Sequence, residues 1–250
     1  MLPARKSAWR DRLMYVYLRR MLGGAFRDVR LRGREHLAAL DPSRPVLAVS
    51  NHAGWWDGLM IFRLTRVLAE RDFYCMMEEK QLRPNRFFTW IGAFGVNLDD
   101  RRESARSLRY ALDLLARPGA LVWVFPQGEL ASPHQPIVVK PGAAFLARKA
   151  EGVQVLPLAL RYEFLRDEKP HALIEAGAPL APAAGAFSDE QIRIGLEAVG
   201  ARLDAAVRTM DVGEGAGFEL LERPRWSVNK RWEWCQLALT GRLAQFDPEN

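Results

Sequence analysis

Short apolar runs alternate with helix-length segments from residue 45 onward, and no other feature of the sequence constrains the fold as much. Each run is bounded by turn residues and rich in apolar side chains, which predicts a buried or half-buried strand. The runs are PVLAVS (45–50), FYCMM (73–77), GVNL (95–98), ALVWVF (120–125), VQVLPLAL (153–160) and HALIEAG (171–177). The segments between them have helical periodicity. Together they predict the α/β class, as a single-domain sandwich with a largely parallel mixed sheet flanked by helices.

The predicted domain lies between a basic segment and an aromatic tail. At 250 residues and 49% hydrophobic composition, the chain is long enough to bury one full core. We place the α/β domain at residues 29–210 and an amphipathic, basic segment at residues 1–28. Residues 211–250 hold a Gly-rich linker (211–224) and then a helical tail with Trp226, Trp232 and Trp234. The tail fits either a second interfacial element or aromatic packing against the core.

Positive charge is concentrated at the N-terminal end of the chain. The formal charge of the whole chain is +6, whereas its first 34 residues alone carry +8 and the remainder carries −2. A charge confined to one end favours contact with an anionic surface. A nucleic-acid-binding domain would more often spread its charge over a folded face, so no nucleic-acid partner is expected.

The N-terminal stretch WRDRLMYVYLRRMLGGAF (9–26) interleaves aromatic and aliphatic residues with arginines. Its apolar part is much shorter than the roughly 20 residues that span a bilayer. It also lacks the small-residue cleavage pattern of a secretory signal. Two interpretations fit: an amphipathic helix at the surface of an anionic membrane, or a helix docked on the core with a solvated arginine face.

Cysteine usage bears on the compartment. Cys75 and Cys235 lie 160 residues apart and form neither a disulfide framework nor a metal-type cluster. Such usage is typical of a reducing compartment. Combined with the basic N-terminal segment, it predicts a cytoplasmic protein bound peripherally, as a monotopic protein, to the inner face of the plasma membrane.

The stretch AVSNHAGWWDGLM (48–60) places His52 and Asp57 directly after a predicted strand. In a continuous helix the two residues would lie about 140° apart, so they can meet only across a turn. Gly54 and the end of the strand predict such a turn, at the edge where ligand sites of α/β sheets gather. Asp57 could then accept the imidazole N–H and leave the other ring nitrogen to take a proton from a hydroxyl.

Five blocks of sequence, in order, resemble the glycerophosphate and lysophospholipid acyltransferase family, of the 1-acylglycerol-3-phosphate acyltransferase type. NHAGWWD (51–57) is similar to the family's N-H-x4-D motif, and LRGREHL (31–37) to its lead-in block. The later blocks are GAFGVNLDDRR (92–102), VWVFPQGE (122–129), and VKPGAAFLA (139–147) followed by VQVLPLAL. The similarity covers about residues 29 to 162.

The resemblance implies transfer of a fatty acyl group from acyl-CoA or acyl-carrier protein, as co-substrate, to a hydroxyl of a lipid-like acceptor. It implies His52 as general base and Asp57 as its orienting partner, with direct attack, no acyl-enzyme, no metal and no other cofactor. A thioester is already activated, so a base, positioning and oxyanion stabilisation suffice. None of the serines lies in a G-x-S-x-G nucleophile elbow.

The resemblance also indicates substrate-binding residues, with two departures from the family pattern. Where the family commonly has F-P-E-G-T-R, this chain has Phe125, Pro126, Gln127, Gly128, Glu129 and Leu130. Gln127 replaces an anion with an amide, and Leu130 removes a guanidinium that would bind phosphate bidentately. Lysophosphatidate therefore stands as a candidate acceptor beside non-phosphate ones: a glycolipid, a carotenoid glycoside or an aminolipid.

Cationic residues complete the candidate site. Either Arg101 or Arg102, in the second block, could hold an acceptor phosphate. Lys140 is similar to an active-site lysine of the family, although an exposed lysine before a proline fits as well. A wider cluster could receive the phosphates of CoA or an acidic carrier protein, or could simply be a solvated helix face. Its members are Lys80, Arg83, Arg86, Arg101, Arg102, Arg106 and Arg109.

Two other function classes stay open. A non-catalytic lipid-binding protein on the same fold predicts that His52→Ala changes no reaction. An acyl-thioester hydrolase, in which His52 activates water, predicts thiol release without any acceptor.

Overall fold

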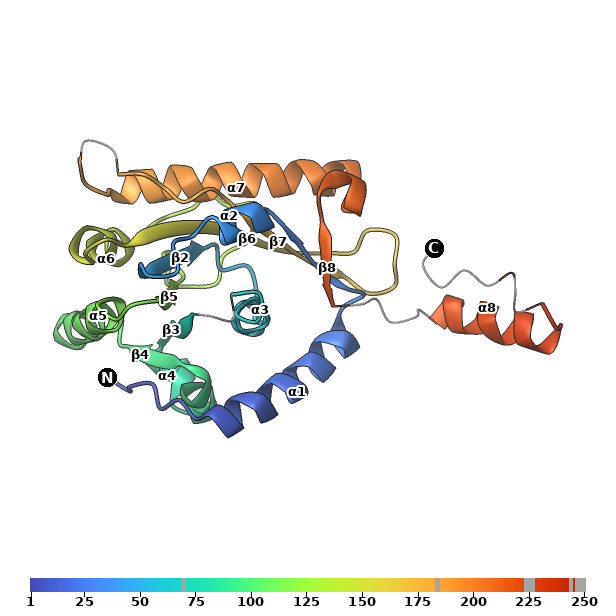
Figure 1. Cartoon of the computed structure of the whole chain (residues 1–250), viewed down its shortest axis with the longest axis horizontal. Coiled ribbons are helices and arrows are strands. Elements are labelled where there is room, and N and C mark those ends of the chain that lie inside the picture. The colour runs from blue at the N-terminus through green and yellow to red at the C-terminus, as the bar shows by residue number, and fades with distance from the viewer. Residues whose placement is uncertain (69–70, 183–184, 223–227, 243–244, 246–250) are drawn as a thin grey trace.

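The computed structural model describes residues 1–68, 71–182, 185–222, 228–242 and 245. An eight-stranded sheet with the order β4-β3-β5-β2-β6-β7-β1-β8 lies between layers of helices (Figure 1). Its strands are β1 (Val29–Arg32), β2 (Val46–Ser50), β3 (Asp72–Glu78), β4 (Ala93–Val96), β5 (Ala120–Val124), β6 (Gln154–Glu163), β7 (His171–Ala176) and β8 (Glu219–Glu222). The predicted α/β sandwich with a largely parallel mixed sheet is therefore confirmed.

Strand direction decides where a site can form. The neighbours β4, β3, β5, β2 and β6 are all parallel, so their carboxyl ends meet at one edge of the sheet. Beyond them, β7 is antiparallel to β6, β1 is parallel to β7, and β8 is antiparallel to β1. The shared edge of the five parallel strands is the place where ligand sites of α/β sheets form.

Helices cover both faces of the sheet. α5 (Arg101–Leu115), α6 (Gly142–Lys149) and α7 (Asp189–Thr209) bury apolar stripes on one face. α1 (Ala8–Ala25), α2 (Arg34–Ala38) and α3 (Asp57–Leu64) pack on the other. The remaining helical elements are α4 (Glu79–Leu82), η1 (Arg86–Ile91), η3 (Glu214–Ala216) and α8 (Val228–Leu239).

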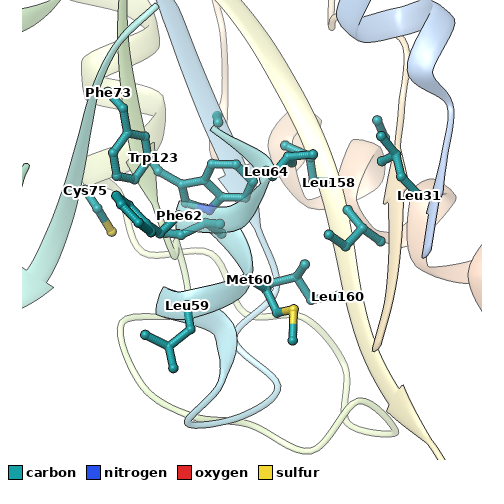
Figure 2. Packing of buried hydrophobic residues seen from close by; sticks show 14 of the residues in the cluster. Leu31, Leu59, Met60, Phe62, Leu64, Phe73, Cys75, Trp123, Leu158 and Leu160 are labelled. Atoms are coloured by element: carbon teal, nitrogen blue, oxygen red, sulfur yellow. The ribbon is translucent and has the colours of Figure 1, made fainter. Parts of the chain in front are cut away.

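The core beneath α3 fixes the start of that helix. Met60, Phe62 and Leu64 are fully or almost fully buried, and Phe62 and Leu64 lie toward Trp123 and Leu158 of the sheet (Figure 2). Side chains with this degree of burial lose positional freedom because protein interiors are packed to crystal density. The first residue of α3, Asp57, is thereby held at the carboxyl edge of β2.

All six predicted strands are present, but β1 and β8 were not expected. β1 offers only two inward apolar residues, Val29 and Leu31, between arginines, so its sequence signal is weak. β8 falls inside residues 211–224, and the prediction of a linker there is wrong. Phe218 is buried ahead of this short strand, and the Gly-rich stretch instead forms η3 and a turn in which Gly217 has a φ of 81°.

The two predicted flanking segments differ in how they join the domain. Residues 1–7 lie beside β4, where Gly95 N donates to Leu2 O at 2.7 Å, and α1 buries Leu18 and Leu22 against the core. The N-terminal segment is therefore built into the domain. The tail is helical as expected in α8, which lies to one side of the sandwich in Figure 1. Its Trp232 and Trp234 are exposed, and Trp226 lies outside the described residues.

Candidate active site

The backbone that leaves β2 is fixed by side-chain bonds to two neighbouring strands. Asn51 donates from Nδ2 to Leu160 O at 2.9 Å and accepts at Oδ1 from Leu160 N at 2.7 Å. Ser50 Oγ accepts from Trp123 Nε1 at 2.9 Å in the buried core. Together these bonds continue the sheet contacts past the end of β2 and hold the next residue, His52, at the sheet edge.

The predicted turn brings His52 and Asp57 together. His52 Nδ1 lies 2.7 Å from Asp57 Oδ2, and Gly54 N donates to the same carboxylate oxygen at 3.0 Å. Asp57 N donates to Gly54 O at 3.1 Å, which closes the turn. The side chain of Asp57 is fully buried, whereas that of His52 is 26% exposed.

Gly54 serves this turn by being small. The sequence suggested that its flexible backbone allows the turn, yet its φ is not in the left-handed region. A Cβ at this position would instead lie 3.2 Å from a ring carbon of Tyr162. The glycine therefore lets the turn pack closely against an aromatic ring.

Tyr162 is a residue of the site that the sequence did not indicate. Its hydroxyl donates to Asp57 Oδ1 at 2.5 Å, from a position 105 residues along the chain. Burial, together with the charge of Asp57 and the hydrogen bond to it, raises the pKa of Tyr162 well above its usual value of 10.0. The hydroxyl therefore stays protonated as a donor at neutral pH.

The third sequence block holds His52 from its other sides. The imidazole stacks on the Phe125 ring with centroids 4.2 Å apart and an interplanar angle of 18°. His52 N donates to Gln127 Oε1 at 2.9 Å, and His52 O accepts from Ala131 N at 2.9 Å. Among the described residues, no hydrogen-bond partner of His52 Nε2 is found. That nitrogen is available to an incoming hydroxyl.

The geometry of Gln127 bears on the first departure from the family pattern. Gln127 is buried and uses its side-chain oxygen to orient the backbone of His52. A glutamate could accept the same hydrogen bond, so the amide conserves this positioning role while it removes a charge. Glu129 and Leu130, which follow Gly128, are exposed.

Lys140 lies beside the turn that follows β5. Lys140 N donates to Pro126 O at 2.9 Å, so its backbone is fixed to the third block. Gly128 has a φ of 68°, and a Cβ added there would lie 2.8 Å from Lys140 Nζ. The structure thus places the ammonium group of Lys140 directly over Gly128.

Arg101 and Arg102 lie farther from His52. They begin α5, whose N-terminus is capped by Asp100, and both are exposed. α5 follows β4, which is separated from β2 by β3 and β5, about 14 Å at the usual strand spacing. The arginines therefore stand at the same sheet edge as His52 but not in contact with it.

Three members of the wider cationic cluster are in ion pairs. Lys80 pairs with Asp99, Arg83 with Glu79, and Arg106 with Glu103.

The two tryptophans of the NHAGWWD motif have different surroundings. Trp56 packs edge-on against Phe26 with ring centroids 5.1 Å apart, whereas Trp55 is 65% exposed. Only Trp55 is placed to contact a ligand or a surface. No cluster of three or more metal-ligating side chains occurs in the described ranges.

Known proteins are similar to this chain in part of its sequence. The chain matches the family model described as Acyltransferase over residues 28–161, just over half of its length. It is 34% identical over 139 residues to a 1-acyl-sn-glycerol-3-phosphate acyltransferase of Chlamydomonas reinhardtii, a stretch that is 54% of this chain and 39% of that protein.

A solved structure has the same architecture. The crystal structure of the 1-acyl-sn-glycerophosphate acyltransferase PlsC from Thermotoga maritima matches with a TM-score of 0.54 and 20% sequence identity, covering 81% of each chain. At this identity the likeness establishes the fold alone. The family model includes His52, Asp57 and the third block within its matched residues, and the chain therefore belongs to the Acyltransferase family.

Proposed function

We propose that this protein transfers a fatty acyl group from an acyl thioester to a hydroxyl of a lipid acceptor, with His52 as general base. One observation carries the proposal: Nδ1 of His52 is bound to a buried carboxylate while the imidazole remains partly exposed. A base needs this combination, because one nitrogen must be oriented and the other must reach substrate. Membership of the family supports acyl transfer as the type of reaction.

In the proposed reaction, His52 Nε2 takes the proton of the acceptor hydroxyl as its oxygen attacks the thioester carbonyl. The new C–O bond forms, the C–S bond breaks, and the thiolate leaves as a thiol with the proton returned by the imidazolium. The carboxylate of Asp57 stabilises the imidazolium that exists in between. No acyl-enzyme is needed because the thioester is already activated.

Lys140 is our candidate for stabilising negative charge in this site. Its ammonium group lies over Gly128, in the block that also contacts His52. A cation near a developing oxyanion, or near an acceptor phosphate, lowers the energy of that charge. Since Leu130 stands where the family commonly has arginine, both lysophosphatidate and acceptors without phosphate fit the proposal. The donor is acyl-CoA or acyl-carrier protein.

The outer side of α1 supports peripheral binding to an anionic membrane. Trp9, Leu13, Val16 and Tyr17 are each more than half exposed and share one side of the helix. Leu18 and Leu22 on the opposite side are buried, so the helix docks on the core and still presents an apolar row outward. No helix among the described residues is long and apolar enough to cross a bilayer. We propose the inner face of the plasma membrane as the location.

The reaction is tested by thiol release with palmitoyl-CoA or palmitoyl-carrier protein, each with lysophosphatidate, a total lipid extract or no acceptor. Release that requires both His52 and a lipid supports a transferase. Release that requires His52 but no lipid indicates a hydrolase. Thiol release that is the same in His52→Ala overturns the assignment of the base.

Membrane binding is tested by flotation with liposomes of anionic or neutral lipid. We expect Leu13→Ala combined with Tyr17→Ala to weaken flotation on anionic liposomes and added salt to weaken it further. A control variant, Ile194→Ala, removes an apolar residue of similar exposure from α7 and is expected to float normally. Unchanged flotation of the α1 variant would contradict the proposed surface.

A further inference from the structure

Three hydrogen-bond donors surround the carboxylate of Asp57. His52 Nδ1 and Gly54 N share Oδ2, at 2.7 and 3.0 Å, and the Tyr162 hydroxyl takes Oδ1 at 2.5 Å. The carboxylate is inaccessible to solvent, so these donors replace the water that would otherwise stabilise its charge. Two of the donors come from the His-Asp turn itself, and only Tyr162 comes from another part of the chain.

The Tyr162 ring is itself held in place by packing against its neighbours. One side of the ring is in close contact with Gly54, where a Cβ would lie 3.2 Å away. Phe26, directly after α1, packs against the same ring with centroids 5.4 Å apart and an interplanar angle of 36°. Tyr162 lies near the end of β6, the strand hydrogen-bonded to β2. Its hydroxyl therefore has one available direction, toward Asp57.

We propose that Tyr162 is a positioning residue, which aims the carboxylate of Asp57 at His52 and sets how strongly His52 holds a proton. Tyr162 acts here through His52, so the inference rests on the proposed function. A buried carboxylate with one oxygen bound only by His52 and Gly54 can rotate about its Cβ–Cγ bond. The bond from Tyr162 opposes that rotation and keeps Oδ2 in line with Nδ1.

The direction of the effect on proton affinity follows from the charges. Without the Tyr162 hydroxyl, the negative charge of Asp57 has one hydrogen-bond donor fewer. That charge then gains more from a neighbouring imidazolium than it does in the wild type. Loss of the donor therefore favours the protonated state of His52. The free-base form that can accept a proton from substrate is then reached only at higher pH.

The test compares the wild-type protein with Tyr162→Phe, which keeps the ring and removes only the hydroxyl. A matched control is Tyr74→Phe. Tyr74 is a second tyrosine whose hydroxyl donates to an aspartate, Asp72 Oδ2 at 2.7 Å, but it is buried on β3, outside the site. Tyr74→Phe removes this bond and also the one that the Tyr74 hydroxyl accepts from Arg117 Nη1 at 3.1 Å, so a general loss of stability would affect both variants.

We expect kcat of Tyr162→Phe to fall about tenfold with KM within about twofold, as for loss of one hydrogen bond to a charged group. The acid limb of the pH–rate profile should move to higher pH. Tyr74→Phe should show neither change. Wild-type kcat and an unmoved acid limb in Tyr162→Phe would overturn the inference.

A second measurement decides the inference even if no acyl transfer is found, in which case the proposed function itself fails. The imidazole of His52 is followed by NMR as a function of pH in all three proteins, with His52→Ala used to assign its signal. A midpoint moved upward in Tyr162→Phe alone supports the positioning role. Identical midpoints in the three proteins overturn it.

Discussion

His52 and His171 each place Nδ1 close to a buried aspartate, at 2.7 Å from Asp57 and 2.8 Å from Asp28, yet their surroundings differ. The side chain of His52 is 26% exposed and that of His171 is 5% exposed. His171 Nε2 lies 3.0 Å from a second carboxylate, Asp167. For His52 Nε2, the described residues provide no such partner. The distance between histidine and aspartate is thus almost the same in both pairs. What differs is whether Nε2 has a second carboxylate as a neighbour.

The surroundings of His171 explain a structural role. Both ring nitrogens lie within hydrogen-bond distance of a carboxylate, Nδ1 of Asp28 and Nε2 of Asp167. Arg30 bonds Asp28 at 2.9 and 2.7 Å, and Arg27 bonds Asp167 at 3.0 Å. This cluster joins the residues after α1 to β1, β7 and the loop before β7. Every polar group in it is paired, so it has no free group to offer a substrate.

The largest expected effect comes from replacing one of the two aspartates, Asp57, by asparagine, with the same replacement at Asp28 for comparison. Asp57→Asn removes the charge that stabilises the imidazolium of His52, and we expect kcat/KM for acyl transfer to fall by about 10² to 10³. Asp28→Asn should keep the wild-type rate per folded molecule. Steady-state kinetics, with the folded fraction measured by circular dichroism, compare the two. Equal losses of rate in both variants would remove the distinction between the pairs.

The next effect concerns stability and should fall on the other pair. His171→Ala leaves two carboxylates without their shared donor, although each keeps an arginine. We expect unfolding to become easier by about 3 kcal/mol, the lower end for a broken buried ion pair, which is roughly 6 to 12 °C in Tm. His52→Ala should change Tm by much less. Thermal denaturation of both variants checks this, and a larger loss for His52→Ala would contradict it.

Acid should weaken the His171 cluster through Asp28. Burial alone would raise the pKa of Asp28, but hydrogen bonds from His171 and Arg30 outweigh it, and the pKa lies below its usual 3.8. A lowered pKa contributes stability that is fully present above 3.8 and is lost as the pH falls through the folded-state value. The stability advantage of the wild type over Asp28→Asn should therefore shrink below about pH 4. Urea midpoints at pH 7, 5, 4 and 3 measure it, and a constant difference would refute the linkage.

The smallest effect is expected at Gly54. The added methyl of Gly54→Ala would press on the Tyr162 ring at 3.2 Å, tighter than ordinary contact. We expect a two- to fivefold loss of kcat, roughly 0.4 to 1 kcal/mol, with the fold retained. Gly58→Ala is the matched control because a Cβ there meets nothing within 4 Å. A wild-type rate in Gly54→Ala would show that the Tyr162 ring can move freely.

Local patterns predicted the elements and the His-Asp turn well. The strands β2, β5 and β6 are continuous apolar runs, and a parallel sheet buries such runs on both faces. The helical angle between His52 and Asp57 excluded a helix and left a turn, which is present. These inferences succeed because each depends on residues close together in the sequence.

The missed features depend on residues far apart in the sequence. Tyr162 lies 105 residues from Asp57, and His171 lies 143 residues from Asp28. No spacing rule links such positions, and a tyrosine at the end of a strand has the same pattern whether or not its hydroxyl finds a carboxylate. β8 was missed for a related reason, because its partner β1 is far upstream and the strand has four residues.

The most direct test of His52-dependent transfer to lipid is the ratio of new lipid ester, by mass spectrometry, to thiol released. It is measured with one acyl-thioester donor and a total lipid extract for the wild type, His52→Ala and His171→Ala. We predict about one ester per thiol for the wild type and for folded His171→Ala. For His52→Ala we predict almost no new ester. Undiminished ester formation by His52→Ala would contradict the account.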